Sequence, residues 1–429
     1  MEFNAEDNYS GYTSKVPYDN EPISRKSSYS KKPTKQTIGT SKLVVFMLCI
    51  IVMVNIVISV CVVNLYSKTR NSSSVVNYNN YTISGDANSG TGTATELANI
   101  LAVAKAKQSA VCVSAGYSSS ADTSITNKEK FFNMKQRGSG VILELDKMNG
   151  VGYIVTCYHV ISGYSSQSYV LLSDSTVPMK AETVNYSSKY DIAVLKVTNE
   201  QLTQSACRAV EVADSSTLAM GETAHAVGNP LGADFRSSTG TVTRPEGLVT
   251  VDGLTHRVVG TDTPINSGNS GGGLFNSKGQ LIGIVNAKTK ATGVDNMAYA
   301  IPSNMAVSLA RNIINNVYPV KAVLGCTFAV RAGVVETEFV GDREVLNYNV
   351  IVTKVDSGSV AENYGFKEND EIISFTYGDT VVSCRSTYTF EDHAFNFNNG
   401  DSVTFIIIRN GEQKIITVKM TKFVAADSN

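Results

Sequence analysis

Residues 260–276 read GTDTPINSGNSGGGLFN and contain a serine, Ser270, flanked by glycines and small polar residues. A serine hydroxyl is a weak nucleophile until an adjacent base removes its proton. Glycines beside it allow backbone N–H groups to face a developing oxyanion, because glycine has no Cβ to hinder the approach. The stretch therefore predicts a nucleophilic serine whose oxyanion hole is the backbone of Gly268, Asn269 and Ser270, with Gly268 and Ser270 supplying the N–H groups.

Two motifs upstream of Ser270 supply the other groups that this chemistry needs. His159 lies in TCYHV, directly after the strand-like run 152–155, and Asp191 opens the apolar run in YDIAVL. Histidine suits a general base because its pKa lies near neutrality. A carboxylate holds the imidazole in the correct tautomer and stabilises the imidazolium that forms. We therefore predict a catalytic triad of His159, Asp191 and Ser270.

The order of these residues along the chain separates the candidate folds. The sequence His, Asp, Ser is the chymotrypsin order, whereas α/β-hydrolases run Ser, Asp, His. Residues 268–272 also match the hydrolase G-x-S-x-G pattern, but that fold needs a helix after the serine and a later catalytic histidine. A strand-like run, GQLIGIVNA, follows instead, and the only later histidine is His393. We interpret His225, His256 and His393 as non-catalytic.

Each of the three motifs is ordinary when taken alone. A single histidine after a strand is usually a packed or surface residue, and an aspartate before a strand or a Gly-Asn-Ser-Gly-Gly segment is usually a turn. Their joint occurrence in one order, each beside a strand-like run, favours the triad over these interpretations. Short β-branched runs between Gly, Asn, Asp and Ser residues extend from about residue 111 to 301 and predict an all-β barrel or sandwich. Helices are expected around residues 97–107 and at 303–316.

The N-terminal third has a different composition. Residues 1–42 are polar and predicted to be disordered, and residues 43–65 form an almost unbroken apolar run long enough for one transmembrane helix. A cleaved signal peptide is the alternative, but the run starts late, is long, and lacks a small-x-small cleavage site. Lysines and arginines concentrate before the run, which predicts a cytoplasmic N-terminus and residues 66–429 outside. Residues 66–94 are predicted to be a flexible linker.

Several segments together resemble the HtrA/Deg family of serine proteases: TCYHVI, YDIAVLKV, AVGNPLG, GTDTPINSGNSGGGLFN, LIGIV and AYAIPSN. The resemblance runs from about residue 95 to the end of the chain. It implies a trypsin-like double β-barrel over residues 95–319 and ATP-independent cleavage of misfolded or exposed polypeptides. It also implies a homotrimer and no cofactor or metal. An anchor, a linker, one protease domain and one PDZ domain resemble the surface HtrA proteins of Gram-positive bacteria.

The sequence departs from the family pattern at three places. Gly273 and Ser267 stand where family members usually have proline, which adds backbone freedom beside the nucleophile. Residues 244–257 occupy the family's regulatory-loop region with a different sequence, so the activating signal stays open. Pro264, six residues before Ser270, is predicted to floor the specificity pocket. An apolar floor favours small or medium aliphatic residues over Lys or Arg, unless Pro264 only shapes the strand.

Residues 321–423 are predicted to be a PDZ domain, a small α+β fold. Leu324-Gly325, within Val323-Leu324-Gly325-Cys326, resembles the loop on which PDZ domains capture a peptide's C-terminal carboxylate through backbone N–H groups. A plain β-rich domain is the alternative. A non-enzymatic PDZ-based binder or holdase is the second functional hypothesis, which the intact triad disfavours.

Composition limits the remaining possibilities. The chain has 429 residues and a formal net charge of -1, so it lacks the basic footprint of a nucleic-acid-binding protein. Of its seven cysteines, two lie in the apolar run. The other five show no CxxC pair, which disfavours a zinc site or a disulfide framework but leaves one disulfide open. These five are Cys112, Cys157, Cys207, Cys326 and Cys384.

Overall fold

The computed structural model describes residues 94–117, 124–229, 235–251, 254–287, 298–315, 319–340 and 343–427. All of them belong to one compact unit, Asp86–Asn429, and a second unit covers Met1–Gly85. The predicted tail, transmembrane anchor and linker (1–42, 43–65 and 66–94) lie outside the described residues, apart from residue 94. Within the described part of the chain, no helix is long and apolar enough to cross a membrane.

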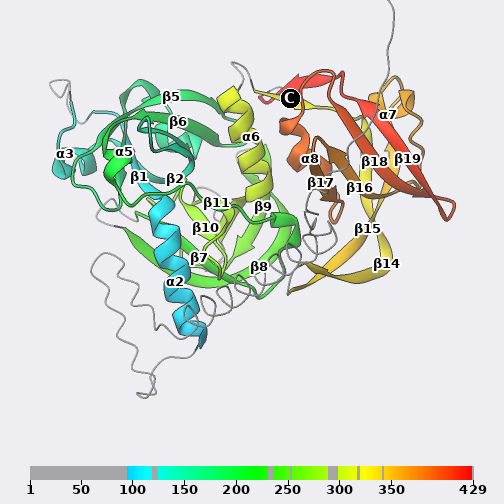
Figure 1. Cartoon of the computed structure of the whole chain (residues 1–429), viewed down its shortest axis with the longest axis horizontal. Helices are drawn as coiled ribbons and strands as arrows, with labels where there is room; N and C mark the ends of the chain where they lie inside the picture. The colour runs from blue at the N-terminus through cyan, green and yellow to red at the C-terminus, as the bar shows by residue number, and fades with distance from the viewer. Residues whose placement is uncertain are drawn as a thin grey trace, which may run out of the picture. The chain divides into compact units, whose positions relative to one another are not determined.

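Six antiparallel strands form the first closed barrel, in the order β1-β2-β3-β6-β5-β4 (Figure 1). Closure pairs every strand on both sides and leaves alternate side chains facing an apolar interior. Val113, Ile154 and Val194 are fully buried there. The strands are β1 (Ala110–Ala115), β2 (Gln136–Asp146), β3 (Val151–Thr156), β4 (Ser168–Leu172), β5 (Met179–Ser187) and β6 (Ile192–Thr198).

A second closed barrel follows, in the order β10-β11-β12-β9-β8-β7. Its strands are β7 (Thr223–Gly228), β8 (Arg236–Val251), β9 (Leu254–Thr261), β10 (Gly273–Phe275), β11 (Leu281–Asn286) and β12 (Ala298–Pro302). Its core includes Val242, Ile282 and Ala300. The mainly-β double barrel predicted from the sequence is confirmed. Residues 244–257 lie in the long β8–β9 hairpin, in which Val251 pairs with Leu254.

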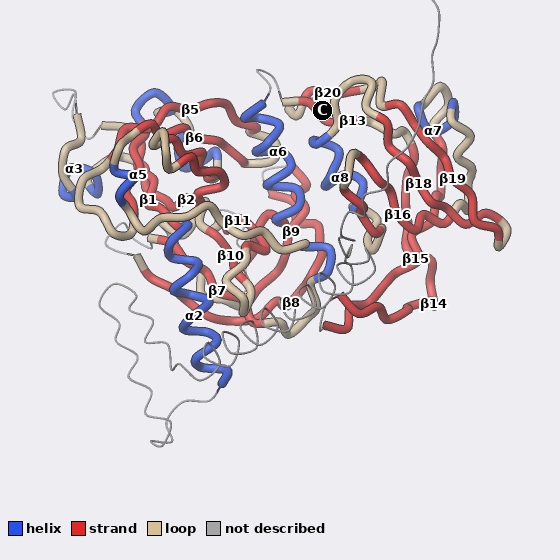
Figure 2. Tube along the Cα trace, viewed as in Figure 1, coloured by secondary structure: helices blue, strands red, loops and turns tan. Residues whose placement is uncertain are grey.

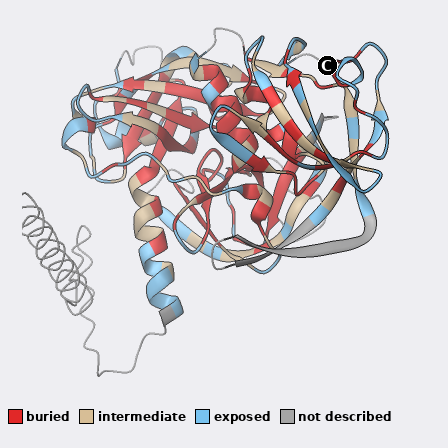
Figure 3. Cartoon of the chain, turned by 45° about the vertical axis from the view of Figure 1, so that its right-hand side comes forward, coloured by how far each residue is buried: buried red, intermediate tan, exposed pale blue. Residues whose placement is uncertain are grey.

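Two longer helices flank the barrels. Helix α6 (Ser303–Asn315) buries Ala306, Leu309 and Ile313 in the core of the first barrel, at the spacing of one helical face. Helix α2 (Ala94–Ser109) buries Ala102 and Ala106, while its first half is largely exposed (Figure 3). Short helices α3 (Lys128–Phe132), α4 (Tyr158–Ile161) and α5 (Gln201–Gln204) complete this part, with single turns η1 (Ser165–Gln167) and η2 (Ser215–Thr217).

The C-terminal module, residues 320–425, is a small α+β fold with its own core of buried aromatic side chains, among them Phe375 and Phe405. Its main sheet has the order β14-β15-β16-β18-β19, and β17 pairs with β16. Strands β13 and β20 pair separately (Figure 2). The strands are β13 (Val320–Ala322), β14 (Cys326–Val340), β15 (Arg343–Val355), β16 (Glu371–Tyr377), β17 (Thr380–Ser383), β18 (Ser402–Arg409), β19 (Glu412–Lys419) and β20 (Phe423–Ala425). The helical segments are α7 (Val360–Asn363), α8 (Thr389–His393) and η4 (Ala394–Asn396).

The C-terminal module packs against the first barrel through η4. Phe395 is buried with the core of the first barrel, and its ring lies 5.3 Å from that of Tyr190 in an edge-on arrangement. Asn312 on α6 donates from Nδ2 to the Phe395 carbonyl at 2.7 Å and accepts the Val320 N–H at 2.9 Å. This one buried amide therefore links α6 to two separate segments of the module.

Candidate active site

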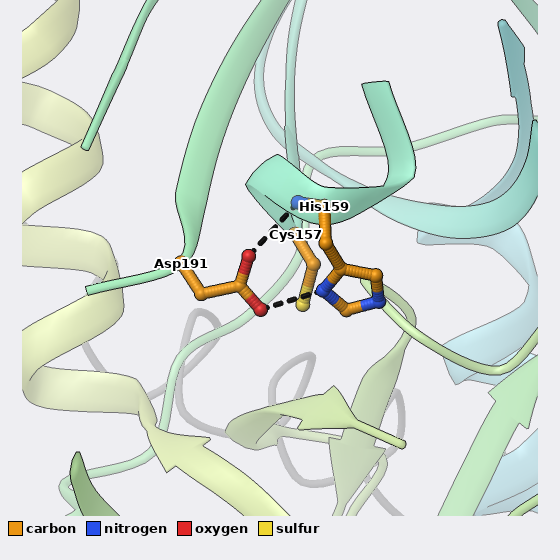
Figure 4. A group of neighbouring side chains, drawn as sticks. All are labelled: Cys157, His159 and Asp191. Carbon is orange, nitrogen blue, oxygen red and sulfur yellow. Dashed lines mark hydrogen bonds and ion pairs between the residues drawn. The ribbon is translucent and has the colours of Figure 1, made fainter. Parts of the chain in front are cut away.

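His159 lies on α4, the single helical turn that directly follows β3. Its backbone N–H donates to Asp191 Oδ1 at 2.9 Å, and its Nδ1 lies 2.7 Å from Asp191 Oδ2 (Figure 4). The two side chains therefore form a hydrogen-bonded pair in which the carboxylate contacts both the ring and the main chain of the histidine. This arrangement fixes the ring orientation and leaves Nε2 as the nitrogen that can accept a proton.

Asp191 sits in the turn between β5 and β6 in a left-handed backbone conformation, with φ +52°. Non-glycine residues adopt this conformation uncommonly, although aspartate tolerates it better than most. The Asp191 carbonyl accepts the Tyr158 N–H at 3.1 Å, so the main chains around both residues are also joined. A strained residue at this position persists only where its surroundings hold it.

Asn286, which the sequence analysis did not single out, completes the surroundings of the carboxylate. It is buried at the end of β11 in the second barrel, and its Nδ2 donates to Asp191 Oδ2 at 2.9 Å. Among the described residues, the Asp191 carboxylate thus accepts three hydrogen bonds, two from His159 in the first barrel and one from Asn286 in the second. The only sequence signal was a polar residue closing the apolar run LIGIV.

Ser270 lies in the loop between β9 and β10, and its hydroxyl accepts the Ala287 N–H at 3.3 Å. Its carbonyl accepts the Ser139 N–H at 2.8 Å. The next residue, Gly271, is so close to β3 that an added Cβ would lie 2.3 Å from Thr156 Oγ1. The structure therefore places the Ser270 loop against the end of the strand that leads to His159. Among the described residues, the Ser270 hydroxyl and the His159 ring are not hydrogen-bonded to each other; such bonds often tighten only when substrate is bound.

The backbone N–H groups of the Ser270 loop differ in whether they already have an acceptor in the protein. The Asn269 N–H donates to the Asn266 carbonyl at 3.0 Å and is therefore engaged. The two predicted donors are the N–H groups of Gly268 and Ser270, and Asn269 is predicted only as part of the loop backbone. The N–H groups of Gly268 and Ser270 have no acceptor within the described chain. The Gly268 carbonyl accepts a hydrogen bond from the Ser139 hydroxyl at 2.7 Å.

Cys157 adds a third ligand-type atom near the His159–Asp191 pair, and the three atoms lie within 4.8 Å of one another. Its thiol lies 3.4 Å from the Val285 carbonyl, and burial raises its pKa well above the ordinary value. A protonated thiol is a poor metal ligand, because metals bind the thiolate. The facing atoms of His159 and Asp191 are already paired with each other. We therefore interpret Cys157 as a packed thiol. It is one of five cysteines in the described chain, and none of the five forms a disulfide there.

Pro264 and two of the histidines that we interpreted as non-catalytic have hydrogen-bond partners outside the predicted triad. Pro264 is exposed between β9 and the Ser270 loop, and its carbonyl accepts the Ser238 hydroxyl at 2.6 Å. His225 is buried on β7 with Nδ1 2.9 Å from Thr239 Oγ1, and His393 lies on α8 with Nδ1 3.2 Å from the Tyr377 hydroxyl. The role of Pro264 in specificity remains a prediction.

Residues 138–284 match the family model of the trypsin-like peptidase domain, a range that contains His159, Asp191 and Ser270. The chain is 34% identical to the serine protease Do-like HtrA of Lactobacillus helveticus, over 66% of this chain and 68% of that protein. It is also 34% identical to the protein of the same name from Lactococcus lactis subsp. lactis, over 67% and 71%. The chain belongs to the HtrA family of serine proteases. As a member of that family it is a serine-type endopeptidase.

Among solved structures, the chain is similar to the serine endoprotease from Yersinia pestis. The identity is 23%, the TM-score is 0.42, and the match covers 77% of this chain and 98% of that one. The double barrel and the His159–Asp191 pair are observations on this chain itself and do not depend on that likeness.

Proposed function

We propose that His159, Asp191 and Ser270 are the catalytic triad of this endopeptidase. The observation that carries the proposal is the 2.7 Å contact between His159 Nδ1 and Asp191 Oδ2, beside a Ser270 loop packed against β3. Ser270 Oγ attacks the scissile carbonyl while His159 Nε2 takes its proton. His159 then protonates the leaving amine, and water releases the acyl group by the same steps in reverse. Asp191 keeps the proton on Nδ1 and stabilises the imidazolium.

The N–H groups of Gly268 and Ser270 are the donors that we assign to the tetrahedral oxyanion. Their lack of a protein acceptor supports this assignment, because donors aimed at charge that develops only in the transition state lower the barrier. Pro264 is proposed to give the specificity pocket an apolar floor, which would favour aliphatic residues before the cleaved bond.

The substrates that we propose are unfolded or exposed polypeptides outside the membrane, as in protein quality control or processing. Residues 43–65 would anchor the chain with its N-terminus in the cytoplasm, and residues 66–94 would act as a tether to the protease domain at 95–319. The excess of Lys and Arg before residue 43 supports this orientation in a Gram-positive-type cell. Protease added to intact cells should remove the C-terminal part and spare an N-terminal tag.

Residues 321–423 are proposed to be a PDZ domain that binds peptide C-termini at Val323–Cys326. The N–H groups of Leu324 and Gly325 find no acceptor among the described residues, which suits capture of a carboxylate. Gly325 has φ +80°, and a Cβ there would lie 2.4 Å from the Ser359 Cβ, so the loop requires glycine. A substrate with a free apolar C-terminus should be cleaved faster than its amidated form; equal rates would contradict the assignment.

We also propose that the enzyme is a homotrimer. Exposed apolar side chains on α2, namely Leu97, Ile100 and Leu101, support association of the protease domain with other copies. Light scattering on the full-length protein measures the mass directly, and a stable monomer would contradict the proposal.

Cleavage of unfolded casein by the full-length protein tests the proposed function. Wild-type protein should produce fragments, and it should cleave a tightly folded protein far more slowly. Ser270→Ala should lose on the order of 10⁶ in kcat, as other serine-protease triads do. Equal cleavage by the two proteins would remove Ser270 from the mechanism, whereas absence of cleavage by both would favour the non-enzymatic binder.

A further inference from the structure

The last described residues of the chain return to the first barrel. Strand β20 pairs with β13, with Val320 opposite Ala425. The next residue, Ala426, donates its N–H to the Pro319 carbonyl at 2.9 Å. Its side chain is only 2% exposed and belongs to the apolar core of the first barrel. This buried alanine holds the following residue, Asp427, against the barrel surface.

Asp427 hydrogen-bonds to the end of β5. Its Oδ1 accepts the Ser187 hydroxyl at 2.6 Å and the Lys189 N–H at 3.1 Å. Ser187 is fully buried, and its hydroxyl oxygen in turn accepts the Tyr190 N–H at 3.3 Å. One carboxylate oxygen thus organises both the start and the middle of the turn that joins β5 to β6.

That turn ends at Asp191. The Asp191 N–H closes the turn on the Ser188 carbonyl at 3.4 Å, and the residue then adopts φ +52°. His159 and Asn286 hold its side chain. The residues that lead into Asp191 are contacted from outside the turn by Asp427, whose Oδ1 accepts hydrogen bonds from Ser187 and Lys189. A backbone conformation of this kind needs support from its surroundings to remain populated.

We propose that Asp427 is a positioning residue for catalysis, which orders the Ser187–Asp191 turn and thereby presents the Asp191 carboxylate to His159. The inference rests on the proposed role of Asp191 in the triad. It makes the segment that follows the C-terminal module part of the support of the active site, although Asp427 lies 240 residues after Ser187 in the sequence. The role requires an oxygen acceptor at Oδ1 and not a negative charge.

Three variants of the full-length protein test this role. Asp427→Ala removes the acceptor and should lower kcat about tenfold with little change in KM, because the carboxylate matters most when the imidazolium forms. Asp427→Asn keeps an acceptor oxygen and should stay within about twofold of wild type. Glu412→Ala, at an exposed ion pair at the start of β19, is the control and should behave as wild type. Wild-type kcat for Asp427→Ala, or equal loss for Asp427→Asn, would overturn the proposal.

The pH profile separates positioning from a loss of folded protein. A misplaced Asp191 stabilises the His159 imidazolium less, so the acid limb of the kcat/KM profile should move to lower pH in Asp427→Ala. A smaller folded fraction would scale the profile without moving it. An unmoved limb together with a reduced rate would therefore contradict positioning.

A double-mutant cycle with Ser187→Ala tests the path from Asp427 to the turn without relying on one variant. Each single change should lower kcat by a similar factor, and the double variant should be no worse than the worse single one. Additive losses would show that Asp427 does not act through Ser187. Ser270→Ala is measured in parallel. Activity of that variant would overturn the triad itself, whereas an inactive Ser270→Ala with a fully active Asp427→Ala would overturn only the present proposal.

Discussion

Asn286 is the residue that most changes the description of the active site. It reaches from the second barrel to the same Asp191 oxygen that contacts the histidine ring, so the two barrels are joined at the Asp191 carboxylate. A buried hydrogen bond to a charged group contributes about 1.5–3 kcal/mol. Asn286→Ala should therefore lower kcat about tenfold or more, because the carboxylate loses an orienting donor. Steady-state kinetics with the Glu412→Ala control decide this; an unchanged kcat would show that His159 alone fixes Asp191.

Local sequence was sufficient to single out His159, Asp191 and Ser270 as candidates, because each stands beside a recognisable strand or in a glycine-rich turn. It was insufficient for Asn286, since a polar residue after LIGIV is also an ordinary strand ending. Its partner, Asp191, is 95 residues earlier in the chain. Only the closure of both barrels brings the two side chains together.

His225 is a buried histidine outside the active site and should make stability depend on pH. Burial lowers its pKa below the ordinary value of 6.5, and its Nε2 has no hydrogen-bond partner among the described residues. The unfolded chain therefore binds a proton at higher pH than the folded chain. The contribution of neutral His225 to the free energy of unfolding is therefore fully present above about pH 6.5. It is lost as the pH falls from there through the lowered pKa of the folded state. His225→Gln should lose less stability than wild type between about pH 7.5 and about pH 5.5 in urea unfolding. Identical losses would show that His225 is not the responsible group.

At the scale of elements, the Ser270 loop packs closely against neighbouring chain at Gly271. Gly271 has φ +82°, and a Cβ there would lie 2.3 Å from the Ser139 carbonyl oxygen and from Thr156 Oγ1. Gly271→Ala should shift the nucleophile and abolish most activity. Gly163→Ala is the matched control, because Gly163 has φ +79° with nothing within 4 Å of the added Cβ. The control should cost about 1 kcal/mol of stability and leave kcat unchanged. Similar kcat values for the two variants would mean that the close contact at Gly271 is unimportant.

Most strands could be predicted from their β-branched runs and turn residues, and so could helix α6, which is described over Ser303–Asn315. The pairing of the strands could not, because a strand's sequence does not name its neighbour. The order β1-β2-β3-β6-β5-β4 places β6 next to β3, which sets the Asp191 turn beside His159. The β8–β9 hairpin was likewise visible only as a region of unusual sequence.

At the scale of the whole molecule, Arg257 on β9 forms a buried ion pair with Asp392 on α8. The Arg257 guanidinium also lies 4.9 Å from the centre of the Tyr388 ring and 3.8 Å from Glu246. Burial raises the pKa of Asp392 from 3.8 to about 6, although Arg257 opposes the rise. The contact ties the C-terminal module to the strand that leads towards Pro264 and Ser270.

Removing one partner of this pair should be worse than removing both. Arg257→Met leaves a buried carboxyl group without its cation and should cost about 3 kcal/mol of unfolding free energy at neutral pH. The double variant Arg257→Met, Asp392→Leu should recover most of that loss. Without Arg257 the pKa of Asp392 rises further, so the protonated form is favoured in the folded state. The deficit of Arg257→Met relative to wild type should therefore grow as the pH rises through about 6, the pKa of Asp392 in the folded wild type, because only the wild type then releases the proton. A pH-independent deficit in urea unfolding, or a double variant no better than the single one, would contradict this description.

Neither this ion pair nor the docking of Phe395 and Asp427 could be predicted from the sequence. The partners are 135 residues apart for Arg257 and Asp392, and 240 apart for Ser187 and Asp427. A single charged residue in a helix or a terminal segment gives no sign of the surface that it contacts. The internal folds of the barrels follow from local patterns, whereas the joint between protease and C-terminal module depends on tertiary contacts alone.

Covalent labelling tests the identity of the nucleophile most directly. A fluorophosphonate probe reacts with a serine only when a neighbouring base activates it. Mass spectrometry of the digested full-length protein should find one adduct, on the peptide that contains Ser270, and none in the His159→Ala variant. An adduct on another residue, or labelling that persists in Ser270→Ala, would contradict the assignment of His159, Asp191 and Ser270 as the catalytic triad.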